Sequence, residues 1–225
     1  MTARNDRDTR ERLLHAATEL FAVTGFHGTT ARDIAQSAGA NVAAANYHFG
    51  SKEALYLEVL RTHFAEIRAR LAKRAPMPSD AVLKRLPRAA LERLVEQRLI
   101  TMLEVLVGPP ASVYGPLIQR EMCDPSAALP HIVDEFIRPQ MLEMRAIYGQ
   151  MFPQLSPGDA DRCAFSMVGQ VMFYHVMRPA VLRFLGRDEY PRGFVRQLAE
   201  HILEYSLGGM ERLAAKRRKG TRRAR

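Results

Sequence analysis

A short segment near the N-terminus brings together side chains that suit contacts with a nucleic acid. Asn41 and Asn46 carry amide groups that can pair with a base edge or with a phosphate. Tyr47, His48 and Lys52 offer a hydroxyl, an imidazole and an ammonium group, all suited to phosphate contacts. The pattern therefore predicts binding chemistry in this segment.

The elements that must position these side chains are a helix, a turn and a second helix. Thr30 with Asp33 forms a capping pair that opens a short helix, and the turn Ala38-Gly39-Ala40 ends it. Asn41 then caps a helix that runs to about His48. In a helix-turn-helix the first helix lies across the phosphates and the second enters the major groove. A compact three-helix core without a DNA role is the alternative, because glycine ends many helices.

The stretch from Phe21 to Leu55 resembles the DNA-binding signature of the tetracycline-repressor (TetR) family. The resemblance is carried by Gly25-Phe26, Thr29-Thr30, Asp33-Ile34-Ala35, Ala38-Gly39 and, most characteristically, Asn46-Tyr47-His48-Phe49 with Ser51-Lys52-Glu53-Ala54-Leu55. It implies an all-helical homodimer that binds a palindromic operator in double-stranded DNA. In most members the protein is a repressor that a small ligand releases.

The resemblance also implies roles for individual positions. Thr30 caps the first helix of the motif against a phosphate, and Arg32 reaches a base. The recognition helix presents Asn41, Val42, Ala43, Ala44 and Asn46, and the backbone is clasped by Tyr47, His48 and Lys52. Many members carry Ser or Thr at position 41, Gly at 43, Thr at 44 and Tyr at 46. The operator sequence can therefore not be taken from relatives.

Composition places the chain among ordinary globular proteins, with 47% apolar and 25% charged residues among 225. No apolar run is long enough to span a bilayer and no signal peptide is evident, so we expect a cytoplasmic protein with Cys123 and Cys163 as reduced thiols. The net charge of +9 is misleading. The last ten residues hold seven basic side chains and no acidic one, which leaves +2 for the remainder.

Helical periodicity runs through the whole chain, and the predicted fold class is all-α. We expect a helix-turn-helix domain over 1–55, a linking helix over 51–74, and a ligand-binding and dimerisation domain over 75–215. A basic tail over 216–225 is expected to be disordered. Three prolines between Ala75 and Pro87 mark the boundary.

The expected helices begin with one that Asp8 and Glu11 cap and Gly25 ends. The later helices are predicted over 88–107, 115–122, 126–151 with a bend at Pro139, 157–185 and 191–215. The helix over 88–107 is apolar on several faces, which is typical of a central, buried helix.

Methionines between Met102 and Met177 suggest an adaptable apolar pocket, although ordinary core filling is the better explanation residue by residue. The pocket itself is implied by the family. The candidate ligand-binding residues are Met102, Leu106, Ile118, Met122, Phe136, Met144, Met172 and Tyr174, with Arg120, Glu121 and His175 as polar anchors. Residues 117–121 with Pro125 also resemble, weakly, a subgroup linked to drug-efflux and stress genes.

The last two long helices carry apolar stripes, and in the family these helices form a four-helix bundle with their counterparts. The stripes are Cys163, Met167, Val171 and His175, then Phe194, Leu198, Ile202 and Tyr205. Packing within one chain and a dimer seam both explain them, and periodicity does not separate the two.

Other functions find less support. His131 with Glu135 lies on one helix face but lacks a third ligand, so we expect no metal, and no cofactor or enzyme motif is evident. A nucleoid protein driven by the basic tail is the alternative to a specific regulator, and the tail itself either solubilises the chain or assists DNA binding. The sequence leaves open the effector, the operator, the regulated genes and the choice between repressor and activator.

Overall fold

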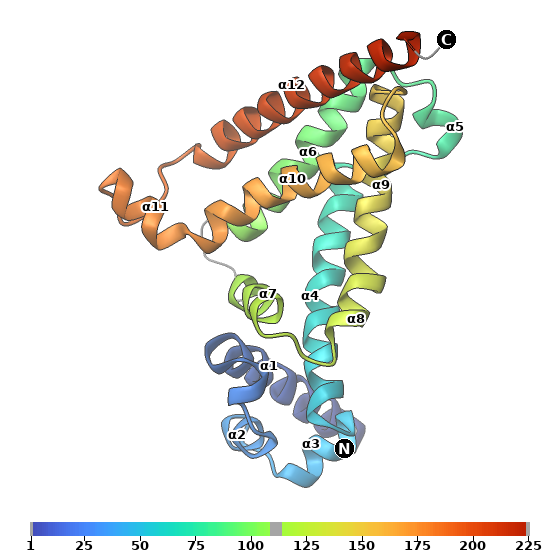
Figure 1. Ribbon diagram of the computed structural model, residues 1–225. Coiled ribbons are helices and arrows are strands. Elements are labelled where there is room, and N and C mark those ends of the chain that lie inside the picture. Colours follow the sequence, from blue (N-terminus) through green and yellow to red (C-terminus); the bar gives the residue numbers. More distant parts are fainter. Residues whose placement is uncertain (1, 109–113, 224–225) are drawn as a thin grey trace. The chain divides into compact units, whose positions relative to one another are not determined.

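The computed structural model describes residues 2–108 and 114–223, and every regular element in these stretches is a helix (Figure 1). The all-helical fold class predicted from the sequence is confirmed. Packing divides the described chain into two compact units. The first unit contains residues 2–66 and 114–136, and the second contains 67–108 and 137–223. No helix in the described stretches is long and apolar enough to cross a membrane.

The first unit is built on α1 (Thr2–Gly28), α2 (Ala31–Ser37), α3 (Val42–Phe49) and the first part of α4 (Lys52–Arg74). Phe21, Ile34 and Tyr56 are buried at its centre, and the rings of Phe21 and Tyr56 meet edge to face with their centroids 4.8 Å apart. Each of α1, α2 and α4 thus contributes a large buried side chain to the centre of this unit.

The start of α1 corrects the sequence prediction. The helix begins at Thr2, so Asp8 and Glu11 lie inside it and do not cap it. Arg7 lies 3.2 Å from Glu11, and Arg12 lies 3.8 Å from Asp8. Ion pairs four residues apart support a helix, here across residues 7–12. The predicted stop is present as a break within α1, because Gly25 has a φ of 76° and leaves the helical conformation.

A segment far along the chain completes the first unit. It consists of α7 (Tyr114–Cys123), α8 (Leu129–Ile132) and the π-helical turn η1 (Val133–Ile137), of which residues up to Phe136 belong here. α7 packs on α1, with Leu117 fully buried. The sequence predicts that this segment belongs to the C-terminal domain, whereas packing groups it with the helix-turn-helix.

The second unit is arranged around α6 (Arg88–Leu106). α6 contacts α9 (Arg138–Met151), α10 (Pro157–Val176) and α12 (Phe194–Arg223), and its Val95, Leu99 and Leu103 are buried. The short helices α5 (Asp80–Leu83) and α11 (Arg178–Leu185) complete the unit. The prediction of a central, buried helix over 88–107 is confirmed.

Proline explains two departures from the predicted helices. The helix expected over 126–151 contains the wide turn η1 just before Pro139. The ring of Pro139 crowds the carbonyl of residue 135, and Pro139 has no N–H to donate to that carbonyl. The helix expected over 157–185 is broken at Met177, because Pro179 likewise provides no N–H for the carbonyl of His175.

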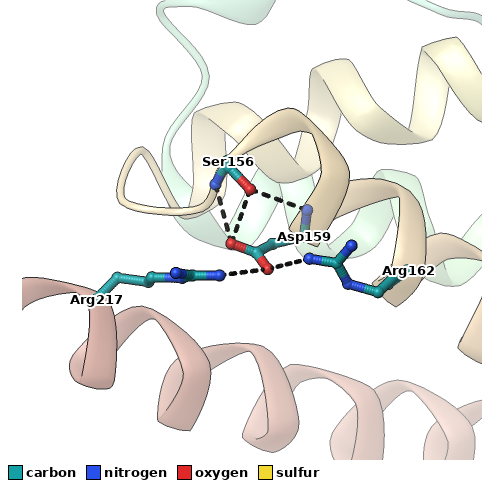
Figure 2. A network of polar contacts seen from close by, with 4 residues as sticks. All are labelled: Ser156, Asp159, Arg162 and Arg217. Carbon is teal, nitrogen blue, oxygen red and sulfur yellow. Dashed lines mark hydrogen bonds and ion pairs between the residues drawn. The ribbon is translucent and has the colours of Figure 1, made fainter.

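Residues 216–223 of the basic tail differ from the prediction, because α12 continues as a helix to Arg223, and residues 224–225 lie outside the described residues. Arg217 holds α12 against α10. Its guanidinium lies 2.9 Å from the carboxylate of Asp159, which Arg162 contacts at 2.6 Å (Figure 2). Asp159 also forms a capping box with Ser156 at the start of α10. A single buried carboxylate thus caps one helix and anchors the end of another.

We expect Asp159→Asn to destabilise the second unit and to loosen the end of α12. The hydrogen bonds from Arg217, Ser156 and Arg162 hold the pKa of Asp159 well below its ordinary value. A lowered pKa in the folded state contributes stability that is present above the unfolded pKa, about 3.9, and that disappears as pH falls below it.

Urea denaturation of the wild type and Asp159→Asn between pH 3 and 7 measures this contribution. The difference in the free energy of unfolding should be constant above about pH 5 and should shrink below about pH 4. Limited trypsin digestion should cleave the variant faster at the end of α12. A difference that does not change with pH would contradict the assignment of this network.

Candidate DNA interface

The turn between α2 and α3 has the backbone geometry that a helix-turn-helix needs. Gly39 has a φ of 60°, in the left-handed region that favours glycine. Asn41 caps α3, with its side-chain oxygen 2.7 Å from the amide nitrogen of Ala44. Arg12 of α1 donates to the carbonyl of Ala38 at 2.8 Å and so holds the turn from outside. The sequence analysis missed Arg12, because its partner lies 26 residues away.

α3 has one face toward the core and one toward solvent. Ala45 is buried, whereas Val42, Ala43 and Asn46 are exposed and Tyr47 is 79% exposed. Positions 42, 43, 46 and 47 share one side of a helix. The exposed side therefore combines small side chains, an amide and a phenol, as a helix that enters a major groove requires.

The N-terminus of α2 lies in the same motif. The capping box of Thr30 and Asp33 is present, which confirms the predicted capping pair. Hydrogen bonds from the hydroxyl and backbone amide of Thr30 lower the pKa of Asp33. Thr30 and Arg32 are both exposed. Their contacts with a phosphate and a base stay predictions.

His48 and Lys52 are partly engaged within the protein. The side chain of His48 is 8% exposed, and its Nε2 lies 3.5 Å from the carboxylate of Asp6. The ammonium of Lys52 donates to the carbonyls of Phe26 and Thr29, both at 3.0 Å, and lies 4.1 Å from the centre of the Phe26 ring. These contacts leave one of the three Lys52 protons for another partner.

A buried hydrogen-bond network joins the helix-turn-helix to α7. The hydroxyl of Tyr56 donates to the carboxylate of Glu121 at 2.9 Å, and both residues are buried. The other Glu121 oxygen accepts from the amide of Ser126 at 3.0 Å and from its hydroxyl at 3.1 Å. Burial, followed by the bond to Glu121, raises the pKa of Tyr56. Arg120 adds a hydrogen bond to the carbonyl of Val23 at 2.5 Å.

The predicted ligand-binding residues are divided between the two units. Ile118, Arg120, Glu121, Met122 and Phe136 lie in the first unit. There Arg120 and Glu121 hold α7 in place, Met122 is exposed, and Phe136 stacks on Phe64 with centroids 3.9 Å apart. Glu135, weighed above as a metal ligand, forms a bidentate ion pair with Arg61 of α4.

The other predicted ligand-binding residues lie in the second unit: Met102, Leu106, Met144, Met172, Tyr174 and His175. Met102, Leu106, Met144 and Tyr174 are partly buried against its core. The Nδ1 of His175 lies 2.7 Å from the carbonyl of Leu106, and Arg178 donates to the carbonyl of Val107 at 3.1 Å. Two basic side chains thus satisfy carbonyls at the end of α6.

One buried charge in this unit was absent from the sequence prediction. Arg98 lies in the middle of α6 and forms an ion pair with Glu143 of α9. A charged residue in an otherwise apolar, central helix was the signal that could have identified it.

The geometry of both units, and the exposed side of α3, define a helix-turn-helix protein.

Comparisons with known proteins agree with this class. The family described as bacterial regulatory proteins, tetR family, matches residues 13–59, and the C-terminal domain of the HTH-type transcriptional dual regulator CecR matches residues 87–210. CecR of Shigella flexneri is 33% identical over 146 residues, which are 60% of this chain and 60% of CecR. The regulator RutR of Escherichia coli K12 is 26% identical over 206 residues, covering 89% of this chain and 90% of RutR.

A solved structure of AibR in complex with isovaleryl coenzyme A and operator DNA has the same fold. Its TM-score is 0.62 at 13% identity, over 87% of this chain and 96% of AibR. The chain belongs to the TetR family of bacterial regulatory proteins, with a C-terminal part of the CecR type. Members of this family are DNA-binding transcriptional regulators and not enzymes.

We expect Asn46→Ala and Tyr47→Ala to weaken DNA binding without unfolding the protein, because both side chains are exposed. Loss of a base-edge contact at Asn46 should cost about 1–3 kcal/mol and should relax sequence preference. Loss of a phosphate contact at Tyr47 should weaken binding to all sequences alike.

Fluorescence anisotropy with an operator selected from random DNA measures both effects. Val23→Ala, which truncates an exposed side chain of α1, is the matched control and should bind as the wild type does. If both α3 variants also bind as the wild type does, α3 is not the recognition helix.

Proposed function

We propose that this protein is a homodimeric repressor that binds a palindromic operator and is released by a small, largely apolar ligand. The observation that carries the proposal is the exposed side of α3, set by a capped and glycine-containing turn, in a chain of the TetR family. AibR supports the combination, because its structure holds both operator DNA and a small ligand. A cytoplasmic location is part of the proposal, because the operator DNA would be found there.

In this proposal the residues at the two helix starts position the protein on DNA. Thr30 and Arg32 contact the backbone and a neighbouring base, and Asn46 pairs with a base edge in the major groove. Tyr47 contacts a phosphate. Asn41 acts mainly through its cap on α3, because its side-chain oxygen is occupied by the amide of Ala44.

The dimer is supported by side chains that the second unit leaves exposed. Met167, Val171, Leu198 and Ile202, part of the stripes noted above, are buried within the unit. The outward side of α10 instead carries Phe165 and Phe173, eight residues apart with Gly169 between them. On α12 the exposed side carries Tyr205, followed by Gly208 and Gly209 with open space beside them.

These two outward surfaces are held in one arrangement. The amide of Gln170 on α10 donates to the hydroxyl of Ser206 on α12 at 3.1 Å, and the two helices pack directly. Glycines allow helices to approach closely and the aromatic side chains supply apolar area, so a second copy of the same pair would bury both surfaces. We infer a four-helix interface made of α10 and α12 from each copy.

We expect Phe165→Glu combined with Phe173→Glu to produce a folded monomer, because two charges would have to be buried in the dimer. Sedimentation at micromolar concentration measures the change, and operator affinity should fall with it. Val82→Glu, which changes an exposed apolar residue on α5, is the control and should remain dimeric. A wild-type chain that stays monomeric even on its operator would refute the dimer.

Ligand release would act through α4. This one helix contributes Lys52–Glu66 to the first unit and Ile67–Arg74 to the second. The two DNA-binding units of a dimer must lie about 34–36 Å apart to occupy successive major grooves. A ligand that favours another position of α4 would therefore weaken simultaneous docking, if it binds the two states with different affinity.

We expect some members of a panel of aromatic and amphipathic compounds to raise the Tm and to weaken operator binding together. Typical coupling of about 1–3 kcal/mol corresponds to roughly 5- to 150-fold in affinity. Thermal shift and operator anisotropy give the two readouts. Compounds that stabilise the protein but leave DNA affinity unchanged would argue against the coupling. A reporter gene behind the selected operator distinguishes repression from activation.

A further inference from the structure

Arg98 is a charged residue buried inside the second unit. It lies in the middle of α6 and is 7% exposed. Burial lowers the pKa of its guanidinium, because the charged form loses its hydration. A methionine or leucine would occupy this position without that cost. The buried guanidinium therefore needs hydrogen-bond acceptors that offset this cost.

Glu143 of α9 is only part of that partner. Its carboxylate accepts from Nη2 of Arg98 and balances the charge, and its own side chain is 33% exposed. Nη1 of Arg98 is buried and has no hydrogen-bond partner among residues 2–108 and 114–223. A buried donor without an acceptor is costly, and more so on a charged group. An acceptor from outside the described chain would remove this cost.

The surroundings of Arg98 suit an apolar molecule. Met102 and Leu106 follow it on α6 at intervals of four residues, so the three side chains share one side of the helix. Met102 and Leu106 are only partly buried against the core, and so are Met141 and Met144 beside Glu143 on α9. α6 and α9 pack directly. Methionine side chains are flexible and adapt to ligands of different shape.

We propose that Nη1 of Arg98 is the polar anchor of the effector site and binds the carbonyl oxygen of an otherwise apolar ligand. An uncharged acceptor is favoured over a carboxylate, because Glu143 already balances the guanidinium and would repel a second anion. The inference rests on the proposed ligand-responsive function and specifies the chemical class of the ligand.

Three probes of similar size test the inference: 4-phenylbutan-2-one, 4-phenylbutanoate and butylbenzene. Their dissociation constants are measured by ligand-observed NMR with the full-length protein. The wild type should bind the ketone about tenfold or more tightly than the hydrocarbon, as expected for a hydrogen bond to a charged group. In Arg98→Met this preference should disappear.

Two further variants separate the anchor from general effects on structure. Arg145→Met removes an arginine whose Nε and Nη2 each bond Asp161 at 2.6 Å, and it should keep the preference for the ketone. Glu143→Gln leaves the charge of Arg98 unbalanced, so the preference should move to 4-phenylbutanoate. Circular dichroism confirms that each variant is folded.

The inference is overturned if no probe binds the wild type saturably, if ketone and hydrocarbon bind equally, or if Arg98→Met keeps the difference. If Arg98→Met does not fold, an unchanged probe order in Glu143→Gln overturns it instead. Operator affinity without probe is measured in parallel. A wild type that binds its operator but shows no preference for the ketone contradicts this inference alone, whereas failure to select any operator contradicts the proposed function and leaves the probe result valid.

Discussion

Glu121 is a buried carboxylate, and the first unit is organised so that its hydrogen bonds are satisfied. Removing a carboxylate from water is costly unless donors replace the water, and here Tyr56 and Ser126 do so. To supply them, α4 must lie against α7, and the chain after α7 must turn back on itself. The aromatic cluster around Tyr56 then places α1, and α1 carries the arginine that holds the turn before α3.

Sequence similarity and packing assign α7 to different parts of the protein. It lies within the stretch that matches the C-terminal domain of CecR, yet it packs on α1 in the same unit as the helix-turn-helix. α4 is divided between the two units, because it begins in the first unit and ends in the second. α4 is thus the helix that runs from the unit with the helix-turn-helix into the unit proposed to bind a ligand. Coupling between sites requires an element that both can bias, and α4 is the candidate.

The two buried charges of the second unit differ in how completely they are satisfied. Asp159 receives hydrogen bonds from a capping serine and two arginines, and this network explains the position of α12. Arg98 has Glu143 but leaves Nη1 without an acceptor in the described chain. A fully satisfied buried network stabilises one packing, whereas in a partly satisfied network the unpaired polar group lowers the stability of the folded protein. That contrast separates the structural charge from the functional candidate.

The sequence alone determined the features that depend on neighbouring residues. The capping box of Thr30 and Asp33, the cap at Asn41 and the central helix after Pro87 were all predictable, because helix ends and helix faces follow from short-range patterns. The family signature supplied the function of that motif. Local patterns were misleading at Asp8, which lies inside a helix that begins at Thr2, and at Met177, where a proline two residues later broke the helix.

Which side chains meet depends on how the helices pack, and the sequence did not predict it. Tyr56 and Glu121 are 65 residues apart, Arg98 and Glu143 are 45 apart, and Arg217 is 58 from Asp159. The packing also decided that Met167 and Val171 face the unit's own core while Phe165 and Phe173 face outward. Periodicity reports that a helix has an apolar side but not what covers it, since burial is a property of the partner as much as of the helix.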